Sequence, residues 1–156
     1  MAIDWDQLLN WITALGTIGA LVFTGYQIMQ ATNQLEANVL YNIKKDGRDL
    51  YKDLFYDNPD VWSQIFSENP PTLTDPTMQV KVNNAIGQIV QFYSTVYDHV
   101  DAGYINKRHL NPLIVDFCEF ATRNTVRPWT EIAVKNPKYD EDFREALGSC
   151  LEGRTP

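Results

Sequence analysis

The stretch NWITALGTIGALVFTGYQIMQATNQ, residues 10–34, decides the architecture expected of this chain. It contains no charged residue, and no Asp, Glu, Lys or Arg occurs between Asp6 and Glu36. Residues 8–29 are its most apolar portion; as an α-helix they would be roughly 33 Å long, close to the roughly 30 Å hydrocarbon core of a bilayer. The stretch therefore predicts a single transmembrane helix, which we assign to residues 1–32.

Polar and small residues in this stretch fall on one line along the expected helix. Steps of three and four residues, a heptad pattern, connect Asn10, Thr13, Thr17, Ala20, Thr24, Gln27, Ala31, Gln34 and Asn38. Helices in lipid associate through small residues and through hydrogen bonds between polar side chains. We therefore expect a homo-oligomer joined by a seam (the oligomer seam) of Asn10, Thr13, Gly16, Thr17, Ala20, Thr24 and Gln27.

Other interpretations of the same pattern stay open. A threonine hydroxyl can bond to a carbonyl of its own helix, so the stretch could be a monomeric anchor. It could also be an exposed amphipathic helix in a soluble assembly. A pore lined by the threonine and glutamine side chains is one form of the oligomer, although no ring of charged residues marks ion selectivity.

The distribution of basic residues predicts the orientation in the membrane. Nothing basic precedes the stretch except the amino terminus, whereas it is followed by Lys44, Lys45, Arg48 and Lys52. By the positive-inside rule, the N-terminus lies outside a bacterial inner membrane and the C-terminal domain is cytoplasmic. Asp4 and Asp6 stand where a cleaved signal peptide would carry basic residues. We therefore expect that the segment is not cleaved, that it anchors the chain by a single pass, and that the lipid bilayer is its partner.

The rest of the chain predicts an all-α domain, residues 33–156. The first helix is expected to continue out of the membrane until the turn DNPDVW at residues 57–62. Apolar residues at helical spacing then predict helices at residues 59–66, 77–102, 107–123, 128–135 and 141–151, and no alternating strand pattern competes with them. Cys118 and Cys150 fall on apolar faces of two of these helices, so we expect buried, reduced thiols, in agreement with a cytoplasmic domain.

Charge and motifs exclude several function classes. A net charge of −7 and a pI near 4.7 argue against binding a long nucleic acid, which requires clustered Lys and Arg. There is no phosphate-binding glycine loop, zinc-spaced Cys/His set or nucleophile elbow. We therefore expect no enzyme, no cofactor and no metal. The nearest ligand clusters, more typical of solvated helix faces, are Asp98, His99 and Asp101, which a hydrolase could use, and Asp116 with Glu119.

The segment RNTVRPWTE, residues 123–131, is the one candidate binding site. Arg123 and Arg127 flank an expected helix start, where free backbone N–H groups and basic side chains together can hold a small anion or a nucleotide, with Trp129 as a stacking face. The competing structural interpretation is that Thr125 caps the helix, Pro128 occupies its first turn, and Trp129 packs into the core.

Five segments of the sequence resemble a known family. They are ITALGTIGALVFTGYQIMQ at residues 12–30, FYSTVYDHVDAGYI at 92–105 with FCEF at 117–120, VRPWTEI at 126–132 and YDEDFREAL at 139–147. With them the chain resembles small bacterial membrane-anchored helical proteins classed as a domain of unknown function. The resemblance implies one N-terminal span and a cytoplasmic helical domain, and it implies no activity.

Two functions follow as hypotheses. The first is an oligomeric membrane effector or sensor, whose helical domain detects a ligand or partner; in architecture it is similar to the membrane-disrupting effectors of bacterial antiviral defence. The second is a passive membrane-anchored scaffold whose helical domain docks a partner protein.

Overall fold

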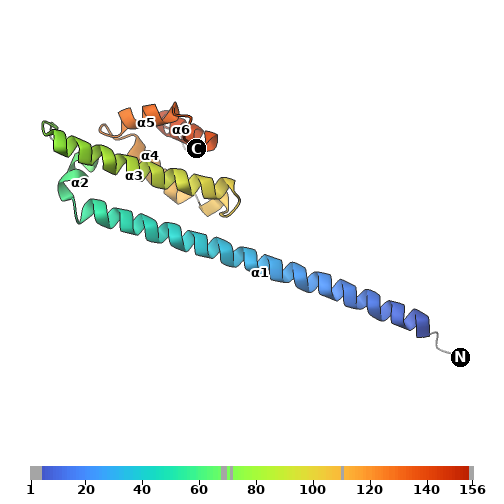
Figure 1. The fold of residues 1–156 in the computed structure, drawn as a ribbon. Helices are drawn as coiled ribbons and strands as arrows, with labels where there is room; N and C mark the ends of the chain where they lie inside the picture. The colour runs from blue at the N-terminus through green and yellow to red at the C-terminus, as the bar shows by residue number, and fades with distance from the viewer. Residues whose placement is uncertain (1–4, 68–69, 71, 110, 155–156) are drawn as a thin grey trace. The chain divides into compact units, whose positions relative to one another are not determined.

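Helices are the only regular secondary structure in the described part of the chain. The computed structural model describes residues 5–67, 70, 72–109 and 111–154, without the side chains of residues 5–12, 14, 15, 55 and 111. Figure 1 shows its elements in order. They are α1 (Trp5–Phe55), α2 (Pro59–Phe66), α3 (Pro76–Asp101), the 3₁₀ turn η1 (Lys107–His109), α4 (Asn111–Ala121), α5 (Arg127–Val134) and α6 (Glu141–Leu151). The predicted all-α class is confirmed.

The chain divides into two compact units. Met1–Asn38 forms the first, which we call the N-terminal unit, and Val39–Pro156 forms the second, the helical unit. The sequence prediction placed a boundary between residues 32 and 33. The continuous helix predicted beyond residue 32 is present, because α1 extends to Phe55 without a break.

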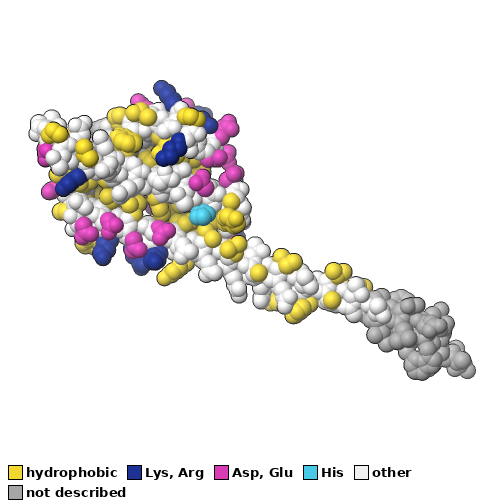
Figure 2. All heavy atoms as spheres, in the orientation of Figure 1, with side chains coloured by type: hydrophobic (Ala, Val, Ile, Leu, Met, Phe, Trp, Pro, Cys, Tyr) yellow, Lys and Arg dark blue, Asp and Glu magenta, His cyan; other side chains and the backbone are white. Residues whose placement is uncertain are grey.

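The described side chains of the N-terminal unit are almost all exposed, including the large apolar ones. Leu21 and Val22 each expose 68% of their surface. The other exposed large apolar residues of this unit have somewhat smaller exposed fractions; they are Ile18, Phe23, Tyr26, Ile28, Met29 and Leu35. In Figure 2, the charge-free stretch of α1 carries yellow apolar side chains, whereas charged side chains gather on the helical unit. These apolar groups are therefore not part of the core of the molecule.

Among the described residues, no helix is both long enough and apolar enough to cross a membrane. The transmembrane helix predicted for residues 1–32 is thus not supported in this part of the chain. A physical reason is that Thr17, Thr24 and Gln27 interrupt the apolar run and lower its mean hydropathy. Part of the predicted span lies outside the described side chains, namely Leu8, Leu9, Ile12 and Leu15.

Helix α3 is the centre of the helical unit. Asp75 caps its first turn, because a carboxylate oxygen accepts a hydrogen bond from Thr77 N–H at 2.9 Å. Gly103, with φ +75°, follows its C-terminal end, in the left-handed conformation in which glycine commonly terminates a helix. The apolar residues at helical spacing, from which this helix was predicted, are buried; they are Val82, Ile86, Ile89, Val90, Tyr93, Val96, Tyr97 and Val100.

The shorter helices close the core around α3. In the helical unit α2 packs on α3, and α6 packs against α3, α4 and α5. The predicted bounds of α2 and α6 are confirmed, and α3 and α5 begin within one residue of the prediction. The helix predicted for residues 107–123 is instead a 3₁₀ turn followed by α4. Pro112 has no backbone N–H and therefore interrupts the hydrogen bonds of a longer helix, whereas it is tolerated in the first turn of α4.

Cys118 and Cys150 form a disulfide that joins α4 to α6. The prediction of reduced thiols is therefore wrong in this structure, although burial of Cys150 is confirmed. Packing of the two helices brings the Cα atoms to 4.9 Å, within bridging distance, and a separation of 32 residues gives no motif that could reveal it. In the chain-entropy model a loop of this length stabilises the fold by about 4 kcal/mol.

Helix α1 contributes to the helical unit through its last turns. Ile43 and Leu54 are buried, and Gly47 lies against α3. A Cβ atom at Gly47 would stand 3.1 Å from Cζ of Phe92, which is closer than side chains normally approach. The absence of a side chain at this position therefore allows α1 to lie close to α3.

Candidate functional site

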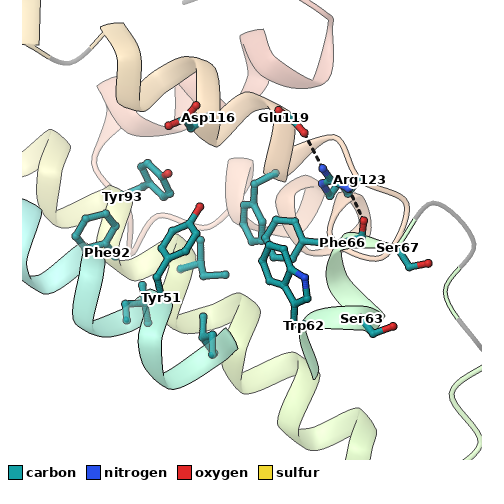
Figure 3. A pocket seen from close by; sticks show the side chains of 15 residues that line it. Tyr51, Trp62, Ser63, Phe66, Ser67, Phe92, Tyr93, Asp116, Glu119 and Arg123 are labelled. Carbon is teal, nitrogen blue, oxygen red and sulfur yellow. Dashed lines mark hydrogen bonds and ion pairs between the residues drawn. The ribbon is translucent and has the colours of Figure 1, made fainter. Parts of the chain in front are cut away.

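The helical unit contains a cavity of about 560 Å³ between four helices. Figure 3 shows the labelled side chains around it: Tyr51 from α1, Trp62 from α2, Phe92 and Tyr93 from α3, and Asp116 from α4. Cavities of this volume are typical of small-molecule sites, which combine apolar and aromatic walls with a few polar groups. The cavity is therefore the candidate functional site.

Six aromatic side chains form a large part of the wall. The rings of Trp62 and Phe66, one turn apart on α2, stack with their centroids 3.4 Å apart. Phe120 on α4 continues the wall, with its ring centroid 6.0 Å from that of Phe66. Because these rings come from different helices, the helix packing sets the shape of the cavity.

Arg123 closes one side of the cavity. Its Nη1 donates to the backbone carbonyl of Phe66 at 2.7 Å, and its Nη2 pairs with Oε1 of Glu119 at 2.6 Å. Its Cζ lies 4.9 Å from the centroid of the Phe66 ring, a cation–π contact. The guanidinium thus satisfies a carbonyl at the C-terminal end of α2 and joins α2 to α4.

Asp116 and Glu119 face the cavity from one side of α4, since they are three residues apart on a helix. Within the part of the chain that the structure describes, no ion pair joins Asp116 to a basic side chain, whereas Glu119 pairs with Arg123. The site therefore carries an excess of negative charge on α4.

The carboxylates on α4 contribute to the raised pKa values of two tyrosines that line the cavity. Burial, followed by the negative charges of Asp116 and Glu119, raises the pKa of Tyr51, while Arg123 partly offsets the effect. Burial also raises the pKa of Tyr93, with smaller contributions from Tyr51 and Asp116. Both phenols consequently stay protonated at neutral pH and can act as hydrogen-bond donors.

The predicted set of Arg123, Arg127 and Trp129 is not brought together in one cavity. Arg123 lines the site just described, but Arg127 is exposed and pairs with Glu131 at 3.2 Å. Trp129 packs against the core, and its Nε1 donates to Oδ1 of Asn83 at 3.2 Å. The anion site therefore stays a prediction, and its two arginines each have an acidic partner.

The structural interpretation of the same segment is partly confirmed. Pro128 lies in the first turn of α5, as predicted. Thr125 does not cap that helix, because Val126 is its N-cap residue and makes no side-chain capping bond. The hydroxyl of Thr125 instead donates to the carbonyl of Gln64 at 3.0 Å, which helps to join this turn to α2.

The oligomer seam stays a prediction. The described members, Thr13, Gly16, Thr17, Ala20, Thr24 and Gln27, are all exposed, and the side chain of Asn10 lies outside the described ones. The hydroxyl of Thr17 donates to the carbonyl of Thr13 at 2.9 Å, the intrahelical bond that a monomeric anchor would also make.

The acidic and histidine clusters do not converge on a metal site. Asp98 and Asp101 are exposed on α3, and the ring of His99 lies edge-on to Tyr104 with centroids 6.1 Å apart. No group of three or more His, Cys, Asp or Glu side chains that could hold a metal ion occurs among the described residues.

Sequence reasoning named Asp116, Glu119 and Arg123 but missed the aromatic part of the cavity. Tyr51, Trp62 and Phe92 are distant in sequence, so only tertiary packing places them together. The one available signal was the composition of α2, where two aromatic rings four residues apart must share a face.

Comparison with known proteins found no matching family model, no similar curated protein and no similar solved structure.

Proposed function

We propose that this chain is a membrane-attached sensor: the charge-free stretch of α1 inserts into a bilayer, and the helical unit binds a small ligand in its cavity. The observation that carries the proposal is the exposure of Leu21, Val22 and Phe23 on a helix without charged residues from Gln7 to Leu35. Transfer of such apolar surface from water into lipid is favourable by about 25 cal/mol per Å².

The cavity supports the sensing part of the proposal. Helix α1 supplies Leu50, Tyr51 and Leu54 to the cavity wall, and the same helix carries the exposed apolar stretch. A ligand that changes the packing of α1 against α3 therefore acts on the helix that we propose to lie in the membrane. The helical unit is proposed to be cytoplasmic, on the argument from Lys44, Lys45 and Arg48.

Cell fractionation tests the membrane attachment. We expect the full chain in the membrane fraction, resistant to extraction by alkaline carbonate and released by a nonionic detergent. The double substitution Leu21→Asp and Val22→Asp should move the chain to the soluble fraction, because two charges in the apolar core of a bilayer cost several kcal/mol, about 2.5–3.5 each.

The matched control uses apolar residues that are exposed on the helical unit. Val80→Asp and Ile132→Asp introduce the same two charges at positions that are 58% and 65% exposed. This variant should stay in the membrane fraction. Recovery of the unmodified chain in the soluble fraction would contradict the membrane proposal.

The competing function is a passive membrane-anchored scaffold that docks a partner protein. The observation that favours a sensor over a scaffold is the cavity, because a docking surface requires no internal space of this size. If ligand occupancy of the cavity leaves the hydrogen exchange of α1 unchanged, the scaffold is the better interpretation.

A further inference from the structure

The charges and rings of the cavity select the chemistry of its ligand. This inference rests on the proposed sensing function and concerns the same site. Three charged side chains line the cavity, Asp116, Glu119 and Arg123. Since Glu119 and Arg123 neutralise each other at 2.6 Å, the carboxylate of Asp116 is the charge left to attract a ligand.

An anionic ligand fits this arrangement poorly. It would have to displace Glu119 from Arg123 and would also meet the negative charge of Asp116. Two of the guanidinium nitrogens already donate, to Glu119 and to the carbonyl of Phe66. Nε is buried and has no hydrogen-bond partner among the described residues, and each Nη keeps one further N–H. An anion bound to these donors would still lie beside the carboxylates of Glu119 and Asp116, whose negative charge repels it.

A cationic ligand fits the charges and the walls. The faces of aromatic rings attract cations, best when the ring is that of Trp or Tyr, and the cavity wall includes Tyr51, Trp62 and Tyr93. Arg123 over Phe66 shows that the wall already accommodates one cation on a ring. The raised pKa of Tyr51, caused by burial and then by the two carboxylates, agrees with a negative potential inside the cavity.

We propose that the cavity binds an organic cation with an apolar or aromatic body, an amine or a quaternary ammonium compound, whose charged nitrogen lies between Asp116 and the aromatic rings. The apolar body would fill the remaining space beside Leu50 and Phe92, and the volume of about 560 Å³ is sufficient for a molecule of this kind.

Calorimetric titration of the full chain in nonionic detergent tests the inference with three probes of similar size. Benzyltrimethylammonium is the cation, phenylacetate the anion and benzyl alcohol the neutral compound. We expect the affinity for the cation to be at least about fivefold higher than the affinity for either of the others. Cation–π contacts and the attraction of a partly exposed carboxylate can each contribute about a fivefold difference in affinity.

Substitutions at Asp116 assign the binding to the cavity. Asp116→Asn should weaken binding of benzyltrimethylammonium about fivefold, and Asp116→Lys should abolish it. The control Asp98→Asn makes the same charge change at an exposed position outside the cavity and should change the affinity by less than about twofold. Asp116 is also exposed and has no ion pair with a described residue, so circular dichroism should show folded variants.

The possible failures are distinguishable. If phenylacetate or benzyl alcohol binds as tightly as the cation, the proposal of a cationic ligand is wrong, whereas the proposal that the cavity is a sensor site stands. If none of the three probes binds, both the ligand class and the sensing function are overturned, while membrane attachment is judged by fractionation alone. Equal weakening by Asp98→Asn and Asp116→Asn would reduce the effect to overall charge and overturn the assignment to this cavity.

Discussion

Tyr97 buries its hydroxyl in the core of the helical unit without a hydrogen-bond partner among the described residues. Burial, followed by the charge of Asp142, raises its pKa to about 12. The folded state therefore keeps the proton to a higher pH than the unfolded state, whose tyrosine has the ordinary pKa of 10.0. The stability from this group is complete below pH 10 and is lost as the pH rises toward 12.

We predict that Tyr97→Phe leaves the free energy of unfolding at pH 8 unchanged or raises it by up to about 1 kcal/mol, because an unpaired buried hydroxyl is removed. The variant should also lose less stability than the original chain between pH 10 and pH 11. Urea unfolding at the three pH values, followed by near-ultraviolet circular dichroism, measures both effects. A loss above 2 kcal/mol at pH 8 would show that the hydroxyl has a partner.

Gly47 and Gly87 provide a matched pair within helices. A Cβ atom at Gly87 would have no atom within 4 Å, apart from its own helix backbone, whereas one at Gly47 would press on Phe92 at 3.1 Å. We predict that Gly87→Ala raises the free energy of unfolding by about 0.5–1 kcal/mol, through the helix preference of Ala. Gly47→Ala should gain less, because the Phe92 ring must move. Equal gains in urea unfolding would contradict the close contact of α1 and α3.

Most helices could be predicted from the sequence because their signals are local. Periodic apolar residues, Pro59 and Pro76 at helix starts and Gly103 after a helix end determine α2 and α3. The break before α4 was not predicted. The spacing of apolar residues is the same whether the helix begins at residue 107 or just before Pro112, so the pattern does not distinguish the two starts. The disulfide and the aromatic wall of the cavity depend on packing between helices, for which a single sequence carries no local signal.

The predicted oligomer seam lies along α1 and is tested on that helix as a whole. We predict that the chain extracted in detergent has a mass of at least two copies, and that replacing Thr17, Thr24 and Gln27 together by Leu returns it to one copy. The reason is that Leu gains nothing over lipid tails in a membrane, whereas polar side chains can hydrogen-bond between helices. Light scattering in detergent gives the mass.

The control for this substitution is Thr32→Leu. Its hydroxyl also donates within the helix, to the carbonyl of Ile28 at 2.9 Å, but it is not a member of the seam. This variant should keep the oligomer. A single copy for the unmodified chain would leave α1 as a monomeric anchor, consistent with the bond from Thr17 to Thr13.

At the scale of the whole molecule, two observations bear on the side of the membrane proposed for the helical unit. Basic residues after the charge-free stretch favour the cytoplasm. The disulfide between Cys118 and Cys150 represents the oxidised form, which persists in oxidising compartments and is rare in the cytosol. The cytoplasmic orientation and the disulfide are compatible if the cysteines are reduced in growing cells and form the bridge only in the presence of an oxidant. Their Cα atoms are 4.9 Å apart, so the bridge can form without a rearrangement of the backbone.

We therefore predict two free thiols per chain in growing cells and none after treatment with diamide. Acid quenching of the cells, followed by alkylation with a maleimide polymer, counts the free thiols on a gel. Cys118→Ser is the control, since its remaining cysteine has no partner within the chain and should be labelled in growing cells. A bridge in untreated cells would place the helical unit on the oxidising side of the membrane and reverse the proposed orientation, because the cytosolic thiol pool would otherwise keep the pair reduced.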